Sequence, residues 1–125
     1  MESLSPNIFT HNMAETIALY KVLGFSVTMS VPESGDDVVW AMMANGSVTL
    51  MFQTFESLAD ELPEISRNKG GSLLLYIDVK NIREFFESIK DKVKVLKGLE
   101  KTFYGATEFS ILDNNNYVLT FAERE

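Results

Sequence analysis

The sequence has no cysteine and only one histidine among its 125 residues. Without cysteine the chain can form neither a disulfide nor a thiolate that binds a metal or attacks a substrate. It contains no run of about 18 apolar residues, so we expect no transmembrane helix. The N-terminus also lacks the basic and apolar segments of a secretory signal. These absences favour a cytoplasmic protein with no membrane partner.

Positive charge is scarce as well. Eleven Lys and Arg stand against 18 Asp and Glu, which gives a net charge of −7. Nucleic acid is therefore not an expected partner, because binding it requires cationic side chains that neutralise phosphates. An acidic surface can attract a cationic small molecule, and it also serves plain solubility.

Apolar residues are abundant, at 46% of the chain. A chain of this length and composition can bury a real core, and we expect one domain over residues 1–125.

The segment 12–25 is the clearest local signal, and it predicts a short helix, a glycine stop and the start of a strand. Asn12 can cap the helix by accepting from a free amide of the first turn, and Glu15 can reach back. Gly24 stands where a helix end needs a left-handed residue. The apolar face of this helix is expected to consist of Met13, Ile17 and Tyr20.

The rest of the first half predicts strands separated by turns. The alternation over 25–31 indicates a strand with one buried face. Asn45-Gly46 is a strong hairpin signal. Further strands are expected at 4–10, 38–44 and 48–53, a loop at 32–37, a helical turn within 56–62 and a break at 69–71.

In the second half, the nearly continuous apolar run at 72–79 indicates a strand covered on both faces. A helix from Ile82 is expected to present the stripe Ile82, Phe85, Phe86 and Ile89 to the core. We also expect strands at 93–96, 107–112 and 117–122, a loop or lid at 98–106, an Asp-Asn turn at 113–116 and a frayed end at 123–125.

Both halves thus share one order, namely strand, helix and three strands. The predicted modules span 4–53 and 72–122, with a linker at 54–71. The predicted class is α+β, with two small curved sheets. Sheets packed side by side would close a concave surface, which is where ligands usually bind.

Several segments carry a family resemblance: Thr16 to Phe25 (TIALYKVLGF), Leu50 to Gln53 (LMFQ), Tyr76 to Val79 (YIDV) and Asp113 to Tyr117. In their order and spacing they resemble the vicinal oxygen chelate superfamily of glyoxalases, bleomycin-resistance proteins and extradiol dioxygenases. The resemblance implies two βαβββ modules that form a curved mixed sheet around a cavity, commonly in a homodimer. At the last of these segments the family usually has Asp-Pro-x-Gly-Tyr, whereas this chain has Asp-Asn-Asn-Asn-Tyr.

The resemblance also implies four metal positions, which the family's enzymes fill with His, Glu or Gln. In this chain they fall on Ser5, on Met51 or its neighbour Gln53, on Ser72 and on Thr120. Hydroxyls are weak neutral donors and methionine suits only soft metals, so we expect no metal and no cofactor.

Two other polar residues are weak candidates for acid or base chemistry. His11 lies at a strand-to-helix junction, where it can equally be a surface or capping residue. Glu108 lies in a predicted strand, where it can face a cavity as a base or cation partner, or simply face solvent.

The predicted function is metal-independent binding of a small molecule, such as sequestration of a bulky organic or cationic compound. Tyr104, beside Gly105 in a predicted loop, is the strongest ligand-binding candidate, because loop aromatics seldom serve the core alone. The alternatives are a glyoxalase- or dioxygenase-like metal-dependent lyase or isomerase, a metal-free enzyme that uses Glu108 or His11, and an interaction module with a vestigial cavity. The predicted ligand-binding residues, each of which could instead belong to the core, are Trp40, Met42, Met51, Gln53, Tyr76, Tyr104 and Thr120.

Overall fold

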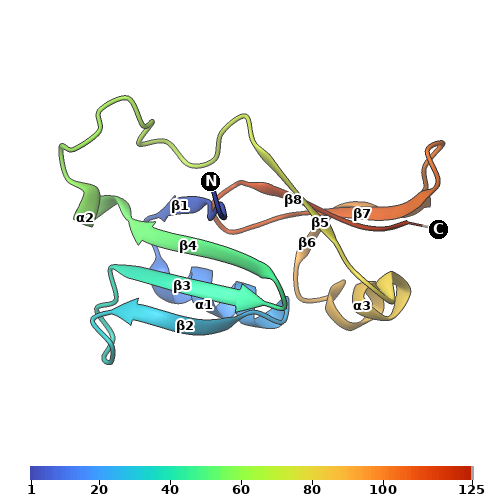
Figure 1. The fold of residues 1–125 in the computed structure, drawn as a ribbon, viewed down its shortest axis with the longest axis horizontal. Coiled ribbons are helices and arrows are strands. Elements are labelled where there is room, and N and C mark those ends of the chain that lie inside the picture. Colours follow the sequence, from blue (N-terminus) through green and yellow to red (C-terminus); the bar gives the residue numbers. More distant parts are fainter. Residues whose placement is uncertain (125) are drawn as a thin grey trace. The chain divides into compact units, whose positions relative to one another are not determined.

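The computed structural model describes residues 1–124, which divide into two compact units. We call residues 1–69 module one and the residues from 70 onward module two. Each module contains one four-stranded sheet, and both sheets have the same strand order, β1-β4-β3-β2 and β5-β8-β7-β6 (Figure 1). In each, the first and last strands pair in parallel and the others are antiparallel. The predicted repeat of strand, helix and three strands is confirmed.

Module one begins with a strand that is shorter than the one predicted over 4–10, since only its last four residues pair with β4. The predicted hairpin at Asn45-Gly46 is confirmed, with Gly46 in the left-handed region at φ +59°. The elements of module one are β1 (Asn7–Thr10), α1 (Met13–Val22), β2 (Ser26–Val31), β3 (Trp40–Asn45), β4 (Val48–Thr54) and the short α2 (Phe55–Leu58).

The predicted cap of α1 is present. The Asn12 side chain accepts from the Glu15 amide at 3.0 Å. Glu15 does not reach the backbone of Asn12, however, and instead accepts from the Asn12 side-chain amide at 3.2 Å, because the Asn12 backbone N–H donates to the Thr10 hydroxyl. Gly24 ends the helix region at φ +96°, as predicted. The cap joins β1 firmly to α1.

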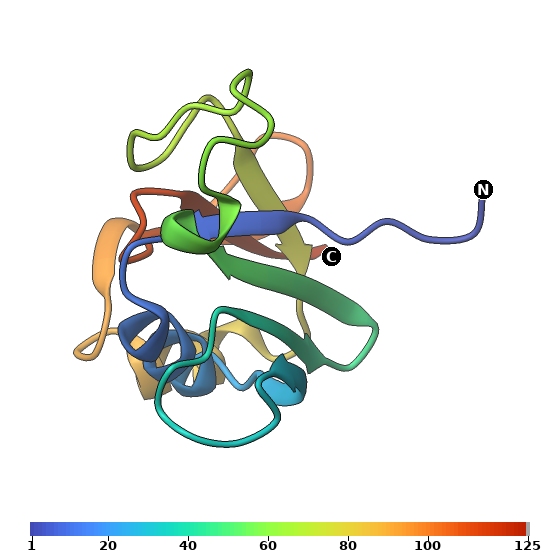
Figure 2. The same cartoon turned by 90° about the vertical axis from the view of Figure 1, so that its left-hand side faces the viewer.

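One face of the first sheet packs against α1, which lies to one side of the strands in Figure 2. Tyr20 of α1 is fully buried, with its ring 4.7 Å from that of Phe52 and 5.6 Å from that of Phe25. The helix buries Thr16 in place of the predicted Ile17, and the buried Thr16 hydroxyl is satisfied by donating to the Asn12 carbonyl at 2.9 Å. The strand residues on this covered face include Ile8, Ala41, Met43, Leu50 and Phe52.

In module two the predicted lid at 98–106 is wrong. β6 continues to Lys101, and only residues 102–105 turn the chain into β7. The predicted frayed end is also wrong for Glu123 and Arg124, which belong to β8, while residue 125 lies outside the described residues. The elements of module two are β5 (Leu74–Asp78), α3 (Ile82–Ile89), β6 (Lys94–Lys101), β7 (Ala106–Leu112) and β8 (Val118–Arg124).

Helix α3 starts at a cap that the sequence does not reveal. Asn81 is left-handed and offers no side-chain cap, so the Glu123 carboxylate accepts from the amides of Asn81 at 2.9 Å and Ile82 at 3.1 Å. These two bonds hold the pKa of Glu123 below its usual range. The end of β8 therefore fixes the beginning of α3.

The core of module two is aromatic, and the predicted helical stripe faces it. Phe85 lies 5.0 Å from Phe121 and Phe86 lies 4.9 Å from Phe109, measured between ring centroids. Ile82 and Ile89 at the two ends of the stripe are buried. The covered strand residues Phe109, Ile111, Leu119 and Phe121 come from β7 and β8.

Two of the edge strands, β2 and β5, are more exposed than predicted. In β2, residues 26–29 are exposed, so the predicted buried face is absent along most of the strand. In β5, Ile77 is buried but Leu74 and Tyr76 are exposed, so the strand is not covered on both faces. Both strands lie at an edge of their sheet, where a neighbouring strand is present on one side only.

Within residues 1–124, the longest helix has ten residues, and none is long and apolar enough to cross a membrane.

We predict that Asn12→Ala lowers the free energy of unfolding by about 1 kcal/mol, because it removes the acceptor for the Glu15 amide. Urea unfolding of the purified protein measures this change. Asn68→Ala is the matched control, since Asn68 is exposed in the segment between α2 and β5. Equal stability of the Asn12 variant and the wild type would contradict the role of the cap.

Candidate functional site

The first sheet has an open face opposite α1, and four predicted ligand-binding residues share it. Trp40 of β3 is paired in register with Gln53 of β4, and Met42 with Met51. Directly opposite residues point to the same side of a sheet. All four are half-buried, whereas their neighbours Ala41, Met43 and Phe52 are buried on the other face.

Two further residues of this face are not predicted from the sequence. β1 pairs in parallel with β4, which aligns Asn7 with Met51 and Phe9 with Gln53. The Asn7 side-chain amide donates to Gln53 Oε1 at 3.0 Å, while Asn7 Oδ1 is buried and has no hydrogen-bond partner within the described residues. The parallel pairing of the first and last strands is the signal that could have identified them.

In module two, a carboxylate and two phenols come together. Tyr76 of β5 and Tyr104 of the β6–β7 turn both donate their hydroxyls to Glu108 Oε2, the latter at 2.6 Å. We call these three residues the tyrosine–glutamate cluster. The cluster lies on the face of the second sheet opposite α3. Ile77, the neighbour of Tyr76 in β5, points into the core, so Tyr76 and its partner in register, Thr120, point to the other face.

The hairpin between β6 and β7 positions Tyr104. The Thr102 amide donates to the Ala106 carbonyl at 2.8 Å, and Gly105 is left-handed at φ +82°. This tight turn places Tyr104 four residues before Glu108, within reach of its carboxylate. The adjacent Phe103 is fully exposed and packs edge-on against Tyr104, with ring centroids 5.1 Å apart.

The hydrogen bonds to Glu108 raise the pKa of Tyr76 to about 12 and raise that of Tyr104. A phenol that donates to a carboxylate resists deprotonation, because the phenolate would lie against a negative charge. Both tyrosines are therefore neutral donors at pH 7, and they are poor proton acceptors.

Thr120 lies on the same face of the second sheet but is 5% exposed. Its hydroxyl is 2.8 Å from that of Ser110, directly across the β7–β8 pair. Thr120 thus forms part of the floor beside Tyr76.

The residues at the metal positions implied by the resemblance do not fit a divalent metal. Ser5 and Ser72 precede their strands. Gln53 Oε1 already accepts from Asn7, and the Thr120 hydroxyl is bonded to Ser110. All of these donors are neutral, and hard or borderline cations prefer carboxylates and imidazoles. Among residues 1–124, no three His, Cys, Asp or Glu side chains gather as a metal site would require.

His11 follows β1 directly in module one. Its ring stacks on Phe55 with centroids 4.3 Å apart, and its Nδ1 is 3.5 Å from Glu56 Oε1. The side chain is about half exposed. These contacts account for His11 as a residue that links β1 to α2.

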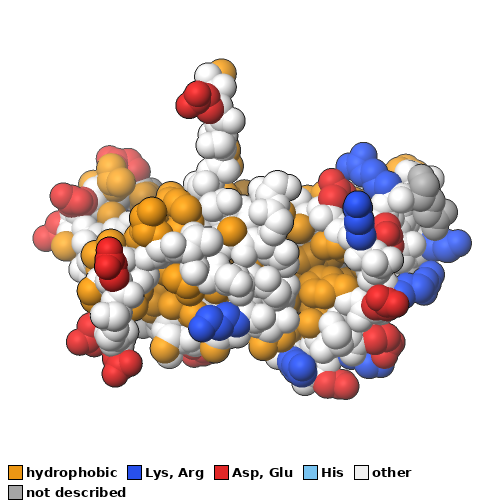
Figure 3. All heavy atoms as spheres, turned by 60° about the horizontal axis from the view of Figure 1, so that its bottom comes forward, with side chains coloured by type: hydrophobic (Ala, Val, Ile, Leu, Met, Phe, Trp, Pro, Cys, Tyr) orange, Lys and Arg blue, Asp and Glu red, His pale blue; other side chains and the backbone are white. Residues whose placement is uncertain are grey.

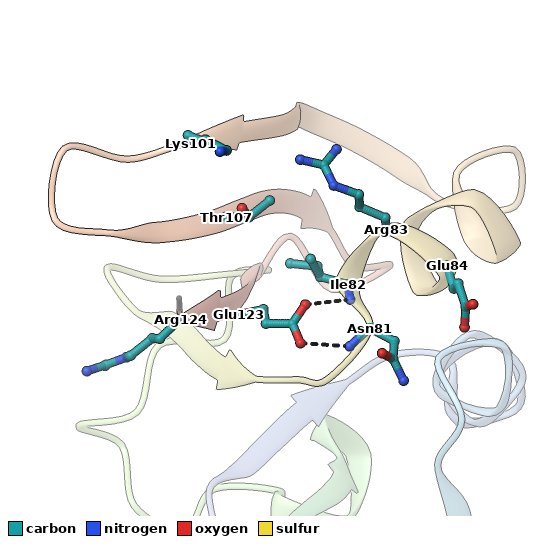
Figure 4. Close-up of a pocket in the computed structure, with 8 residues that line it drawn as sticks. All are labelled: Asn81, Ile82, Arg83, Glu84, Lys101, Thr107, Glu123 and Arg124. Carbon is teal, nitrogen blue, oxygen red and sulfur yellow. Dashed lines mark hydrogen bonds between the residues drawn. The ribbon is translucent and has the colours of Figure 1, made fainter.

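A separate hollow of about 480 Å³ lies beside the start of α3 (Figure 4). The Arg83 side chain points across it toward Lys101, but the helix amides that could bind an anion are already bonded to Glu123. It contains none of the ligand-binding residues predicted from the sequence. Its lining consists of Asn81, Ile82, Arg83, Glu84, Lys101, Thr107, Glu123 and Arg124.

Charge is divided unevenly between the modules. Residues 1–69 contain three basic residues (Lys and Arg) and nine acidic residues (Asp and Glu), which gives a net charge of −6. Residues 70–125 contain eight basic and nine acidic residues, which gives a net charge of −1. Figure 3 shows hydrophobic side chains exposed between these charged groups. The chain thus offers apolar and acidic surface together.

Comparison with known proteins identifies the class. The family model described as the glyoxalase/bleomycin resistance protein/dioxygenase superfamily matches residues 4–121. The chain therefore belongs to this superfamily, and the resemblance drawn from the sequence is confirmed. A comparison with curated protein sequences finds no match.

Solved structures share the fold. A glyoxalase/bleomycin resistance protein/dioxygenase family enzyme from Burkholderia phytofirmans PsJN is 22% identical, with 97% of this chain and 98% of that chain covered and a TM-score of 0.77. A protein of unknown function from Agrobacterium tumefaciens is 19% identical, with 100% of this chain and 95% of that chain covered and a TM-score of 0.79. A bleomycin-binding protein in complex with bleomycin is 19% identical, with both chains fully covered and a TM-score of 0.66.

We predict that Glu108→Gln lowers the pKa of Tyr76 from about 12 toward the ordinary value of 10.0 and also lowers that of Tyr104. The amide keeps an acceptor for the hydroxyls but removes the negative charge that opposes phenolate formation. NMR titration of the tyrosine ring carbons measures both values. Glu84→Gln on α3 is the control, and unchanged tyrosine titration in the Glu108 variant would contradict the cluster.

Proposed function

We propose that this protein binds an organic small molecule without a metal ion and holds it rather than transforming it. The open face of the first sheet carries the proposal, because it presents Trp40, Met42 and Met51 together with the amide of Gln53. A flat aromatic ring, polarisable thioethers and a few polar groups suit varied organic ligands.

The side-chain oxygen of Asn7 on this face also supports binding of an organic ligand. Asn7 Oδ1 is buried without a partner within residues 1–124, and a buried acceptor left unbonded costs stability. Because Oδ1 has almost no exposed surface here, a ligand would donate to it only after the Asn7 side chain moves, and that hydrogen bond would remove the cost. The face therefore combines apolar area with a specific polar contact.

The donor set supports metal independence. The residues at the implied metal positions are serine, threonine, methionine and a glutamine already bonded to Asn7, so these positions offer no carboxylate or imidazole to hold a Lewis-acid metal. The two weak acid–base candidates already have partners. Glu108 accepts hydrogen bonds from two phenols, and His11 stacks on Phe55 and lies within hydrogen-bond distance of Glu56. These contacts favour binding over catalysis.

A bleomycin-binding protein of the same fold has been solved with bleomycin bound, so binding of an organic compound occurs on this architecture. By analogy we propose sequestration of a bulky organic or cationic compound as the role of this chain. From the family resemblance and the composition, we also propose that it acts as a homodimer in the cytoplasm.

The test is a fluorescence screen on Trp40, the only tryptophan in the chain. We predict that an aromatic organic ligand changes Trp40 emission saturably and that EDTA leaves the response unchanged. Met42→Ala should weaken binding by about 1 kcal/mol, roughly fivefold in Kd, because the ligand loses the half-buried thioether that it would cover.

Leu62→Ala is the matched control, since Leu62 is a large exposed apolar residue outside the sheets. Metal analysis of the purified protein accompanies the screen. A stoichiometric divalent metal that is required for the response would overturn metal independence, and a flat response to all compounds would favour an interaction module instead.

A further inference from the structure

We propose that the tyrosine–glutamate cluster of module two binds the charged group of an organic cation, such as an ammonium or guanidinium. This inference rests on the proposed function and deepens it, because it names the chemical class of the ligand. It depends on the charges, the aromatic rings and the hydrogen bonds around Glu108.

Among residues 1–124, the cations on this face pair with carboxylates other than Glu108. Arg124 Nε lies 3.7 Å from Asp78 Oδ1, and Lys97 Nζ lies 2.7 Å from Glu100 Oε1. Glu108 is bonded instead to two neutral phenols. Lys97 lies near enough to sense the charge of Glu108, but its ion pair is with Glu100. Arg124 likewise lies near enough to oppose the rise in the pKa of Tyr76, but it pairs with Asp78. Within residues 1–124, Glu108 is therefore in no ion pair of its own.

The strand register adds a like charge beside it. Glu100 of β6 lies directly opposite Glu108 of β7. The ion pair with Lys97 neutralises most of the charge of Glu100, so the repulsion between the two carboxylates is weakened but not replaced by an attraction. A bound cation at Glu108 would supply that attraction. Ala122, opposite Glu108 on the β8 side, is too small to cover the carboxylate.

The two tyrosine rings provide the rest of the site. Tyr76 is 43% exposed and Tyr104 is 57% exposed, so their ring faces remain accessible although their hydroxyls are bonded. Cations are attracted to the faces of aromatic rings. Both hydroxyls donate to Glu108 Oε2, which leaves Oε1 to accept from a ligand N–H. Aromatic faces beside a carboxylate oxygen are complementary to an organic ammonium.

The experiment compares two probes of the same size, 2-phenylethylammonium and the neutral 2-phenylethanol. Each is titrated into the ¹⁵N-labelled full chain, and amide shifts locate where it binds. We expect the ammonium to bind on the order of tenfold more tightly than the alcohol and to shift Tyr76, Tyr104 and Glu108. The preference should fall as salt is added.

Three variants separate the roles within the cluster. Glu108→Gln should remove the preference for the ammonium, whereas Glu84→Gln, which changes the net charge equally on α3, should leave it intact. Tyr104→Phe should retain binding, because it keeps the ring and frees a lone pair on Glu108. Amide spectra of each variant establish that its fold is unchanged.

Equal binding of the two probes, or an ammonium preference that survives Glu108→Gln, overturns the cation site and leaves organic-ligand binding standing. Ammonium shifts confined to other residues overturn it equally. If neither probe binds to module two, the cation site is also wrong, and the Trp40 screen decides separately whether the proposed function holds.

Discussion

One helix covers one face of each four-stranded sheet, and this constraint shapes both modules. Tyr20 packs between α1 and the first sheet, and the phenylalanines of α3 pack between that helix and the second sheet. Within residues 1–124, only the short α2 of module one makes a contact on the opposite faces, where Phe55 packs against Phe9 at the end of β1, so most of the side chains there are not covered by a helix of their own module. Module one places aromatic and thioether groups there, and module two places a carboxylate between phenols. The chemistry of the chain follows from these uncovered faces.

Much of the architecture can be predicted from the sequence, because the residues that start and stop its elements are close together along the chain. The Asn12 cap, the stop at Gly24 and the turn at Gly46 each depend on a few neighbouring residues. The repeat of strand, helix and three strands follows from their order. The shared face of Trp40, Met42, Met51 and Gln53 follows from strand alternation once the hairpin is placed.

The features that sequence reasoning missed depend on contacts between distant segments. β6 carries register shifts around Lys97, which blur the period-two pattern and make its end resemble a loop. Glu123 looks like part of a frayed terminus because its partners, the amides at the start of α3, lie about forty residues earlier. Tyr76 and Glu108 are likewise far apart in the sequence and meet because β8 pairs with both of their strands. No local pattern encodes such pairings.

The central claim is that the open faces, rather than the cores, receive the ligand. Methionine methyl NMR tests it most directly, because methionines lie on both faces of the first sheet. Met42 and Met51 are on the open face, whereas Met13 and Met43 are buried in the core. On saturation with an aromatic ligand, the account predicts shifts of the Met42 and Met51 methyls and unchanged Met13 and Met43 methyls. Shifts of Met13 and Met43 with silent Met42 and Met51 would contradict it.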